Sequence, residues 1–589
     1  MPMRSDLLLV HVPSVFDFRE RLTLYGPISD VIPSTPVFEM YPIGFATMSH
    51  YLDRLGFKVR ILNLAVKMLR DRDFDPESYL KKFKPALFGL DLHWLTHIHG
   101  VVEAARLLKR LHPEIPIVLG GLTASYFHRE ILESYPEIDY VIRGDCAEEP
   151  VAKLLSTIRW GGDPGNVPNL SYRRGEGIVE GAIELVPDSL DDFPLNYRHM
   201  IRQVHHHRDL TSYSPFRKWL FYPITAVLTC KGCIHDCVTC GGSLSAMKRV
   251  VNRHRIAFKD PKILAGEVSS IINYLRGPIF FVGDCLQGGP EHFQEMMKAL
   301  RPLRIKNEIM MEFFSPPGKE VLKEIASTFE HFNLEISPES HDEEVRKAFG
   351  RPFDNRSLEG FIEDARSVGC RRMDLFFMTG LPRQDCRSVL GTVDYCRSLM
   401  REFGSGIRLV PFVSPLAPFV DPGSDVFEEP GKYGYRLRFR TLEEHRQAML
   451  ALTWVDMLNY ETRWMDRETI AVATYESAIG LSLLKSEHGQ LSRRESEAVV
   501  ARARAEMEFM TSCRTEGAAS PDGEERTTAS MKRYMRRNRG ASVCRKEELN
   551  MPVNPFRLHL FNLARLLLTG REDSFDQRPA SLDPGRQTG

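Results

Sequence analysis

Apolar residues in the first part of the chain fall into short runs that alternate with longer stretches of helical periodicity. The run from residue 6 to 12 stops at Pro13, and similar runs cover residues 57–62, 86–90, 117–119 and 139–142. Between them, residues 101–111 place apolar side chains at helical spacing. Short buried strands that alternate with helices indicate an open parallel sheet, so we predict an α/β domain over residues 1–160.

A second alternating series occupies residues 221–430. Its strand-like segments end near Leu228, Val282, Phe314, Ile336, Met378 and Phe412, with helical segments between them. Six strand–helix repeats predict a partial (β/α)6 barrel, in which chemistry belongs at the carboxyl ends of the strands. Residues 161–220 are rich in Gly, Pro and Arg, and we predict a connector there.

The pattern becomes mainly helical over residues 431–589. Residues 513–550 are polar and basic without a period, so we predict a flexible segment. A last apolar helix is expected over residues 556–568. We expect its leucines to pack on the protein, and the alternative is a helix that lies in a membrane interface.

Composition narrows the class of protein. The formal net charge of the 589 residues is zero, so no nucleic-acid partner is expected. No apolar stretch reaches the ~18–20 residues that span a bilayer, and the first residues lack the features of a signal peptide. We therefore expect a cytoplasmic protein, in which structural disulfides are rare. Eleven cysteines in such a chain indicate metal or redox chemistry.

Three of these cysteines stand close together in CIHDCVTC, residues 233–240, just after the first strand of the second series. A structural zinc site needs four ligands, and no second C-x-x-C pair occurs. A [4Fe–4S] cluster has four irons that are usually held by four thiolates. Cys233, Cys237 and Cys240 would therefore leave one iron open for chemistry, and we select them as metal-binding and catalytic residues. Cys230 is a competing ligand with poorer spacing.

This C-x-x-x-C-x-x-C motif, placed after the first of six strands, resembles the signature of radical S-adenosylmethionine (SAM) enzymes. The resemblance implies that the open iron binds SAM and that an electron from the cluster generates a 5′-deoxyadenosyl radical. It also implies a low-potential electron donor of the flavodoxin or ferredoxin type. The alternative is a structural metal site or a chance spacing.

The resemblance also implies residues that bind SAM. Gly283-Asp284 ends the second strand where the family often has Gly-Gly-Glu, so Asp284 departs from that pattern. Ser337 and Glu339 end the fourth strand, near the expected ribose. Arg351 would pair with the SAM carboxylate, and its alternative is an ordinary surface arginine at a helix end. Gly380 ends the fifth strand at the expected adenine side.

The order of the two domains resembles the cobalamin-binding radical SAM subfamily. It implies that residues 1–160 form a doubly wound, Rossmann-like B12-binding domain. The cobalamin D-x-H-x-x-G motif is absent after the first strand, so no cobalt ligand is assigned. One alternative is a Rossmann-like domain without B12. The residues implied for cobalamin are Pro13, Pro42, Gly44, Asp91, His93, Gly120 and Gly121, although His93 could equally be a satisfied polar residue at a strand end.

Together these features imply a cobalamin-dependent radical SAM enzyme that methylates an unactivated carbon of a small-molecule or lipid substrate. A non-methylating cyclase, a rearrangement enzyme and a lipid-modifying enzyme are alternatives with the same domains. A methylthiotransferase acting on RNA would need three more cysteines in the first domain, where only Cys146 lies. A cobalamin or redox sensor without catalysis is the remaining alternative.

Overall fold

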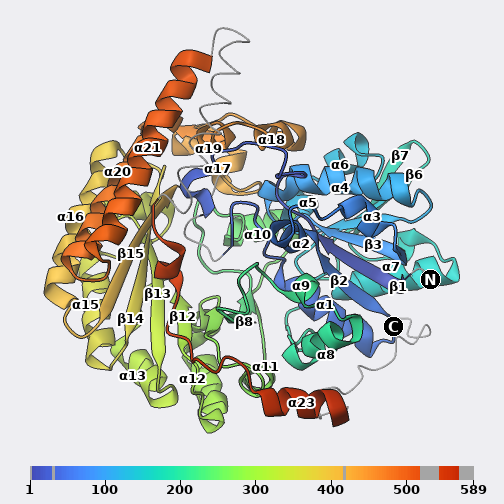
Figure 1. The fold of residues 1–589 in the computed structure, drawn as a ribbon, viewed down its shortest axis with the longest axis horizontal. Helices are drawn as coiled ribbons and strands as arrows, with labels where there is room; N and C mark the ends of the chain where they lie inside the picture. The colour runs from blue at the N-terminus through green and yellow to red at the C-terminus, as the bar shows by residue number, and fades with distance from the viewer. Residues whose placement is uncertain (1–2, 30–33, 416–418, 518–542, 570–589) are drawn as a thin grey trace.

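The computed structural model describes residues 3–29, 34–415, 419–517 and 543–569 (Figure 1). Its first domain is built on a seven-stranded sheet in the order β2-β1-β3-β4-β5-β6-β7. Neighbouring strands from β2 to β5 pair in parallel, whereas β6 and β7 are antiparallel. The strands are β1 (Met3–His11), β2 (Val59–Asn63), β3 (Phe83–Asp91), β4 (Ile117–Gly120), β5 (Tyr140–Ile142), β6 (Leu170–Arg174) and β7 (Gly177–Glu180).

Successive residues of β1 point to opposite faces of this sheet. Leu8 and Val10 join the apolar core that includes α4 (Ile98–Leu111). Leu7 and Leu9 join a second core with α1 (Ile43–Arg54) and α7 (Glu148–Trp160). Helices therefore cover both faces of the sheet, as a continuous apolar strand requires, and the doubly wound fold is confirmed.

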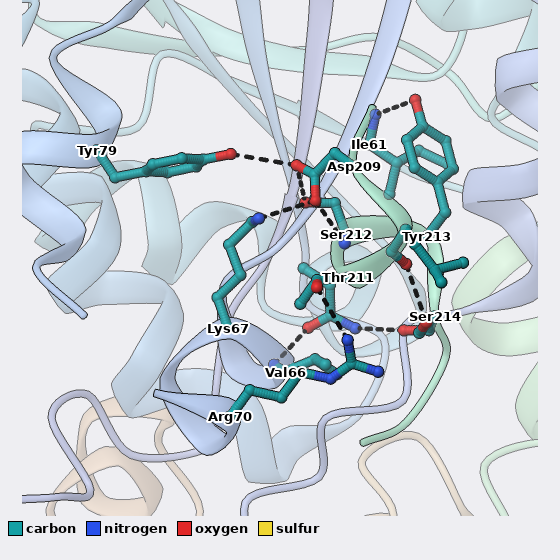
Figure 2. Close-up of polar contacts among 12 residues, drawn as sticks. Ile61, Val66, Lys67, Arg70, Tyr79, Asp209, Thr211, Ser212, Tyr213 and Ser214 are labelled. Atoms are coloured by element: carbon teal, nitrogen blue, oxygen red, sulfur yellow. Dashed lines mark hydrogen bonds and ion pairs between the residues drawn. The ribbon is translucent and has the colours of Figure 1, made fainter. Parts of the chain in front are cut away.

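The segment predicted as a connector contains regular structure. Besides β6 and β7, it forms α8 (Tyr197–His207) and α9 (Leu210–Tyr213). Asp209 caps α9 and ties it to the first domain, because it accepts hydrogen bonds from Lys67 Nζ at 2.8 Å and Tyr79 Oη at 3.1 Å (Figure 2). Polar anchoring of this kind leaves no apolar period in the sequence, which is why the elements were not predicted.

The second domain is a six-stranded parallel sheet in the order β15-β14-β13-β12-β11-β8, whose two edge strands remain unpaired with each other. This is the predicted partial barrel. Its helices include α11 (Pro261–Ile272), α13 (Lys319–Thr328), α15 (Asn355–Ser367) and α16 (Cys386–Phe403). The strands are β8 (Thr225–Leu228), β11 (Ile279–Val282), β12 (Ile309–Phe313), β13 (Phe332–Glu339), β14 (Arg372–Thr379) and β15 (Arg408–Pro415).

The C-terminal region is mainly helical, with α20 (Arg467–Glu487) packed against α16 and β15, followed by α21 (Arg493–Gly517). Among the residues described, no helix has both the length and the apolar character to cross a membrane.

Residues 543–551 lie across the inner face of the barrel (Figure 1). On β14, Met373 and Leu375 pack in the outer core, so Arg372 points inward, where it donates to the carbonyls of Asn550 at 2.9 Å and Glu548 at 2.6 Å. Residues 543–550 of the segment predicted to be flexible are thus held by charges and carbonyls rather than by an apolar pattern, and residues 513–517 continue α21. Residues 518–542 of the predicted flexible segment lie outside the described part.

The buried Lys485–Glu548 ion pair, at 2.7 Å, fixes this inner segment to α20. Both side chains are only 4% exposed, so Lys485→Met would leave a carboxylate buried without its cation. We expect a loss of about 3 kcal/mol in the free energy of unfolding, measured by urea titration. Adding Glu548→Gln should recover most of it, and a double variant as unstable as Lys485→Met would contradict this account. The exposed Lys432–Glu429 pair supplies the control, because Lys432→Met should change stability by less than about 1 kcal/mol.

Candidate functional site

The cysteine loop is held from two sides at the carboxyl edge of the barrel sheet. Val238 donates its N–H to the Phe349 carbonyl at 3.0 Å, and its own carbonyl accepts from Val426 at 2.9 Å. Gly350 makes the first contact possible, since a Cβ there would lie 2.8 Å from the Asp236 carbonyl oxygen and the backbone has φ +111°. The loop is therefore positioned by backbone contacts that do not use the thiols.

The three predicted ligands share this loop. Cys237 is buried, while Cys233 and Cys240 are half-buried. Backbone N–H groups already point at two sulfurs, from His235 to Cys233 Sγ at 3.4 Å and from Gly242 to Cys240 Sγ at 3.3 Å. Burial raises the pKa of all three thiols, that of Cys237 to about 11. Without a metal they are therefore protonated, and iron would have to displace the protons.

Among the described residues, no three His, Cys, Asp or Glu side chains form a group that could hold a metal ion. In an iron–sulfur cluster each thiolate bonds a different iron, so the sulfurs need not meet at one point. The assignment of Cys233, Cys237 and Cys240 as cluster ligands stays a prediction.

Arg351 lies beside the cysteine loop and is only 8% exposed, so the alternative of a surface arginine is wrong. Its Nη1 donates to the Phe314 carbonyl at 2.6 Å, and the guanidinium stacks 4.8 Å from the Phe314 ring centroid. Its Nη2 lies 3.4 Å from Glu339 Oε1. Burial lowers the pKa of Arg351, but the charges of Glu339 and of the three cysteines, where these are ionised, outweigh that effect and the net shift is upward.

Asp284 occupies the predicted position after β11. Its carboxylate accepts backbone N–H groups from Leu286 and Phe314, both at 2.9 Å. A second acid, Glu312 on β12, accepts the Gly283 N–H at 2.9 Å and was not selected from the sequence. Burial raises the pKa of both carboxyls. A charged residue within the buried strand IMMEF was the signal that could have revealed Glu312.

The site has more acids than cations, since Asp284, Glu312 and Glu339 all act electrostatically with Arg351. Burial raises the pKa of Glu339 to about 7 despite Arg351. Among the described residues, Glu339 Oε2 and Arg351 Nε have no hydrogen-bond partner. Glu339 also has φ +67°, a conformation that non-glycine residues adopt at a cost. A strained acceptor beside an unsatisfied donor suits a ligand that carries both an ammonium and a carboxylate.

The two other predicted SAM contacts lie at the same edge. Ser337 falls in the bulge between Ile336 and Glu339, where the pairing of β13 and β14 shifts. Gly380 follows β14, and its carbonyl accepts the Tyr435 hydroxyl at 2.7 Å. The C-terminal region therefore closes over Gly380, and the adenine-side role of Gly380 stays a prediction.

In the first domain, Gly120-Gly121 and His93 lie next to each other at the ends of β3 and β4. A Cβ on Gly121 would lie 2.6 Å from the His93 backbone, and its φ of +116° also favours glycine. The Pro13-Ser14 turn is tied to α4, because Gly100 donates to the Ser14 carbonyl at 3.0 Å. Pro42 and Gly44 stand at the start of α1 instead. Their predicted contacts with cobalamin remain predictions.

Asp91 already has a partner, which the sequence did not suggest. Its carboxylate binds His11 Nδ1 at 2.9 Å, while His11 Nε2 lies 3.1 Å from the Phe38 carbonyl. Burial lowers the pKa of His11, but Asp91 and Phe38 outweigh that effect and the net shift is upward. His93 behaves oppositely, because burial lowers its pKa and favours the neutral ring.

The carboxyl edges of the two sheets are joined by a buried ion pair. Arg253, 2% exposed, binds both oxygens of Asp145 at 2.5 and 3.0 Å. Lys231, two residues before Cys233, donates to the Asp145 carbonyl at 2.6 Å. Since Asp145 follows β5, the loops after the first sheet contact the segment that leads into the cysteine loop.

Comparison with known proteins finds relatives for both parts of the chain. Residues 30–155 match the family described as the B12 binding domain. Hopanoid C-3 methylase of Methylococcus capsulatus is 25% identical over 346 residues, which are 57% of this chain and 60% of that protein. Anaerobic magnesium-protoporphyrin IX monomethyl ester cyclase of Synechocystis is 26% identical over 223 residues, which are 38% and 42% of the two chains. Both alignments span less than two thirds of the relative.

The fold is shared over a longer stretch. The structure of the radical S-adenosylmethionine methyltransferase TsrM from Kitasatospora setae, with cobalamin and a [4Fe–4S] cluster bound, aligns with a TM-score of 0.55 at 15% identity. That alignment covers 91% of this chain and 99% of TsrM. The chain thus combines a match to the B12 binding domain with a three-cysteine motif, in a two-domain fold similar to that of TsrM.

Proposed function

We propose that this protein is a radical SAM enzyme that methylates an unactivated carbon with the help of a [4Fe–4S] cluster and cobalamin. The observation that carries the proposal is the unsatisfied pair of Glu339 Oε2 and Arg351 Nε, buried next to the three cysteines. The names of the relatives support it, because one is a methylase and the similar structure is that of a methyltransferase. The cyclase relative keeps non-methylating radical chemistry as the second candidate.

Different residues of the barrel would bind the cluster and the two charged groups of SAM. Cys233, Cys237 and Cys240 would hold the cluster. Arg351 would pair with the SAM carboxylate, and Glu339 would accept from its ammonium, because each has an atom without a partner among the described residues. Asp284 holds the backbone of the loop after β12 through the Phe314 N–H. When bound, the cluster would supply the electron that cleaves SAM to the 5′-deoxyadenosyl radical, and cobalamin would supply the methyl group.

The first domain would hold cobalamin at the edge that contacts the cysteine loop. Gly120 and Gly121 leave room for a close approach of the cofactor to the backbone. The His11–Asp91 pair is internal to the domain and braces the ends of β1 and β3. His93 is half-buried and neutral, so we place it near the cofactor without assigning it as a cobalt ligand.

The inner face of the barrel offers an acceptor to a substrate that carries a hydrogen-bond donor. Glu335 pairs in register with Glu312 and Asp374, and no hydrogen bond to its carboxyl occurs among the described residues. Burial and Glu312 raise the pKa of Glu335 well above its usual value. The substrate that we propose is a small molecule or a lipid. A cytoplasmic location and a low-potential donor of the flavodoxin or ferredoxin type complete the proposal.

The first test is SAM cleavage by the anaerobically reconstituted protein with cobalamin and a low-potential reductant. We expect 5′-deoxyadenosine by mass spectrometry, and a product heavier by one methylene once the substrate is found. Cys237→Ala should abolish 5′-deoxyadenosine, whereas Cys396→Ala, a buried cysteine on α16, should preserve it. A Cys237→Ala variant that cleaves SAM at the wild-type rate would refute the assignment of the cluster ligands.

The pKa of Glu339 predicts how SAM binding depends on pH. Below about pH 7 the carboxyl is protonated in the free protein, and above it the carboxylate can attract the SAM ammonium. We expect SAM affinity to rise about tenfold from pH 6 to pH 8, as one deprotonation with a pKa of about 7 requires. Equilibrium dialysis with labelled SAM would measure this rise. In Glu339→Gln the affinity should be lower at pH 8 and nearly independent of pH, and an unchanged profile would exclude Glu339 from the ammonium site.

The Asp145–Arg253 pair predicts coupling between the domains. Arg253→Met leaves Asp145 without its buried cation, so we expect a loss of about 3 kcal/mol in stability. Product methylation should also fall more than 5′-deoxyadenosine formation, because the first domain loses its fixed position over the cysteine loop. The ratio of the two products measures this effect. Arg301→Met, in the exposed pair with Glu324, serves as the control. An equal fall of both products would show that the pair acts on folding alone.

A further inference from the structure

Among the described residues, the most exposed large apolar side chains gather around α23 (Leu560–Thr569), which projects from the base of the barrel domain (Figure 1). Five large apolar side chains there are between 69% and 85% exposed. Elsewhere in the described residues, only Trp160, at 79%, is comparably exposed. The five residues are Phe221, Phe556, Leu560, Phe561 and Leu568. An apolar patch of this kind on a protein surface indicates a binding site.

The apolar stripe of α23 faces away from the protein. Asn562 donates to the Asn273 carbonyl at 2.7 Å and Leu566 is 5% exposed, so these positions face the barrel domain. Leu560, Phe561 and Leu568 lie on the other side, at helical spacing. A surface helix normally has its polar side chains outward. The expectation that the leucines of this helix pack on the protein is therefore wrong for Leu568 and Leu560, although it holds for Leu566.

The start of the helix is fixed to the barrel. Arg276 donates its backbone N–H to the Arg557 carbonyl at 2.9 Å, and His559 donates to the Tyr274 carbonyl at 2.9 Å. Leu275 and Leu558 form an antiparallel bridge between these contacts. These backbone contacts hold the start of α23 in one position, with its apolar stripe exposed.

The charged residues of the two segments that carry the exposed apolar side chains are cations. Residues 551–569 contain Arg557 and Arg565 and no acid, and residues 215–221 contain Arg217 and Lys218 and no acid. Arg557 joins the two segments, because its guanidinium lies 5.6 Å from the centre of the Phe221 ring. Apolar side chains rimmed by cations are typical of segments that bind the surface of an anionic membrane.

We propose that α23, together with residues 215–221 and Phe556, is a docking surface for an anionic lipid bilayer, in which it inserts its apolar side chains at the headgroup level. Ten helical residues extend only ~15 Å, half the hydrocarbon thickness, so the helix lies in the interface and does not span it. A second copy of the chain fits the surface less well. A twofold contact through this stripe would bring the same cations together without an acid from either segment.

Vesicle flotation with the purified full chain tests the proposal. We expect the protein to float with phosphatidylcholine vesicles that contain phosphatidylglycerol, and to float at least tenfold less with pure phosphatidylcholine or in high salt. Phe561→Ser with Leu568→Ser should reduce binding to anionic vesicles at least tenfold, and Phe556→Ser with Leu560→Ser should act likewise. These side chains are exposed, so thermal unfolding should not change. Trp160→Ser, which removes an equally exposed ring from α7, is the matched control and should bind as the wild type does.

Three results would overturn the proposal. The first is a wild-type protein that stays with the dense fractions for both kinds of vesicle. The second is a Phe561→Ser and Leu568→Ser variant that floats as well as the wild type. The third is light scattering that shows a dimer which the same double variant converts to a monomer, without vesicle binding by either protein. That last result would assign the surface to a second copy of the chain. All three readouts are independent of SAM cleavage, so they do not depend on the proposed function.

Discussion

The buried contact between Asp145 and Arg253 is the constraint on which the arrangement of this protein depends. Each sheet presents its carboxyl edge, where parallel strands leave their loops and ligands bind. One apolar core runs through both domains, and the bidentate Asp145–Arg253 pair, with a 2% exposed guanidinium, restricts how their edges are oriented. Lys231 donates to the Asp145 carbonyl and so links this pair to the segment that leads into Cys233.

Within the barrel, the distribution of charge matters more than any single residue. Glu339, Glu312 and Asp284 all have a raised pKa, which means that burial destabilises their charged forms more than Arg351 stabilises them. Such a site is poorly satisfied by itself, and it is best completed by a ligand that brings positive charge. The proposed ligand, a sulfonium compound with an ammonium group, has that property, and its carboxylate would offer Arg351 Nε the acceptor that the nearby acids do not supply.

The sequence located the strands of both sheets closely, because buried parallel strands are short apolar runs that stop at Gly, Pro or charged residues. The predicted end at Val282, for example, is the end of β11, and Ile142 is the end of β5. It also singled out the cysteine loop and Arg351, which the structure brings close together, while their roles toward a cluster and SAM stay predictions.

What the sequence could not supply were partners distant along the chain. His11 looks like one more strand residue until Asp91, 80 positions away, is placed beside it. Glu312 and Glu335 interrupt apolar strands, and only the register of β12 with β13 shows that they are neighbours. The hairpin of β6 and β7 is too short to show a clear period, although Leu170 and Tyr172 are buried, and the inner segment near Glu548 is ordered by hydrogen bonds to residues elsewhere.

The inner segment also has a consequence for biosynthesis. Arg372 and Asn550 are 178 positions apart, and the cysteine loop precedes both. During translation the loop leaves the ribosome long before residues 543–551 can enter the barrel. For the time that the ribosome needs to add those residues, the amino-terminal end of the barrel's inner face, at Arg372, therefore lacks the segment that covers it. Slow translation of the last part of the chain would lengthen that interval.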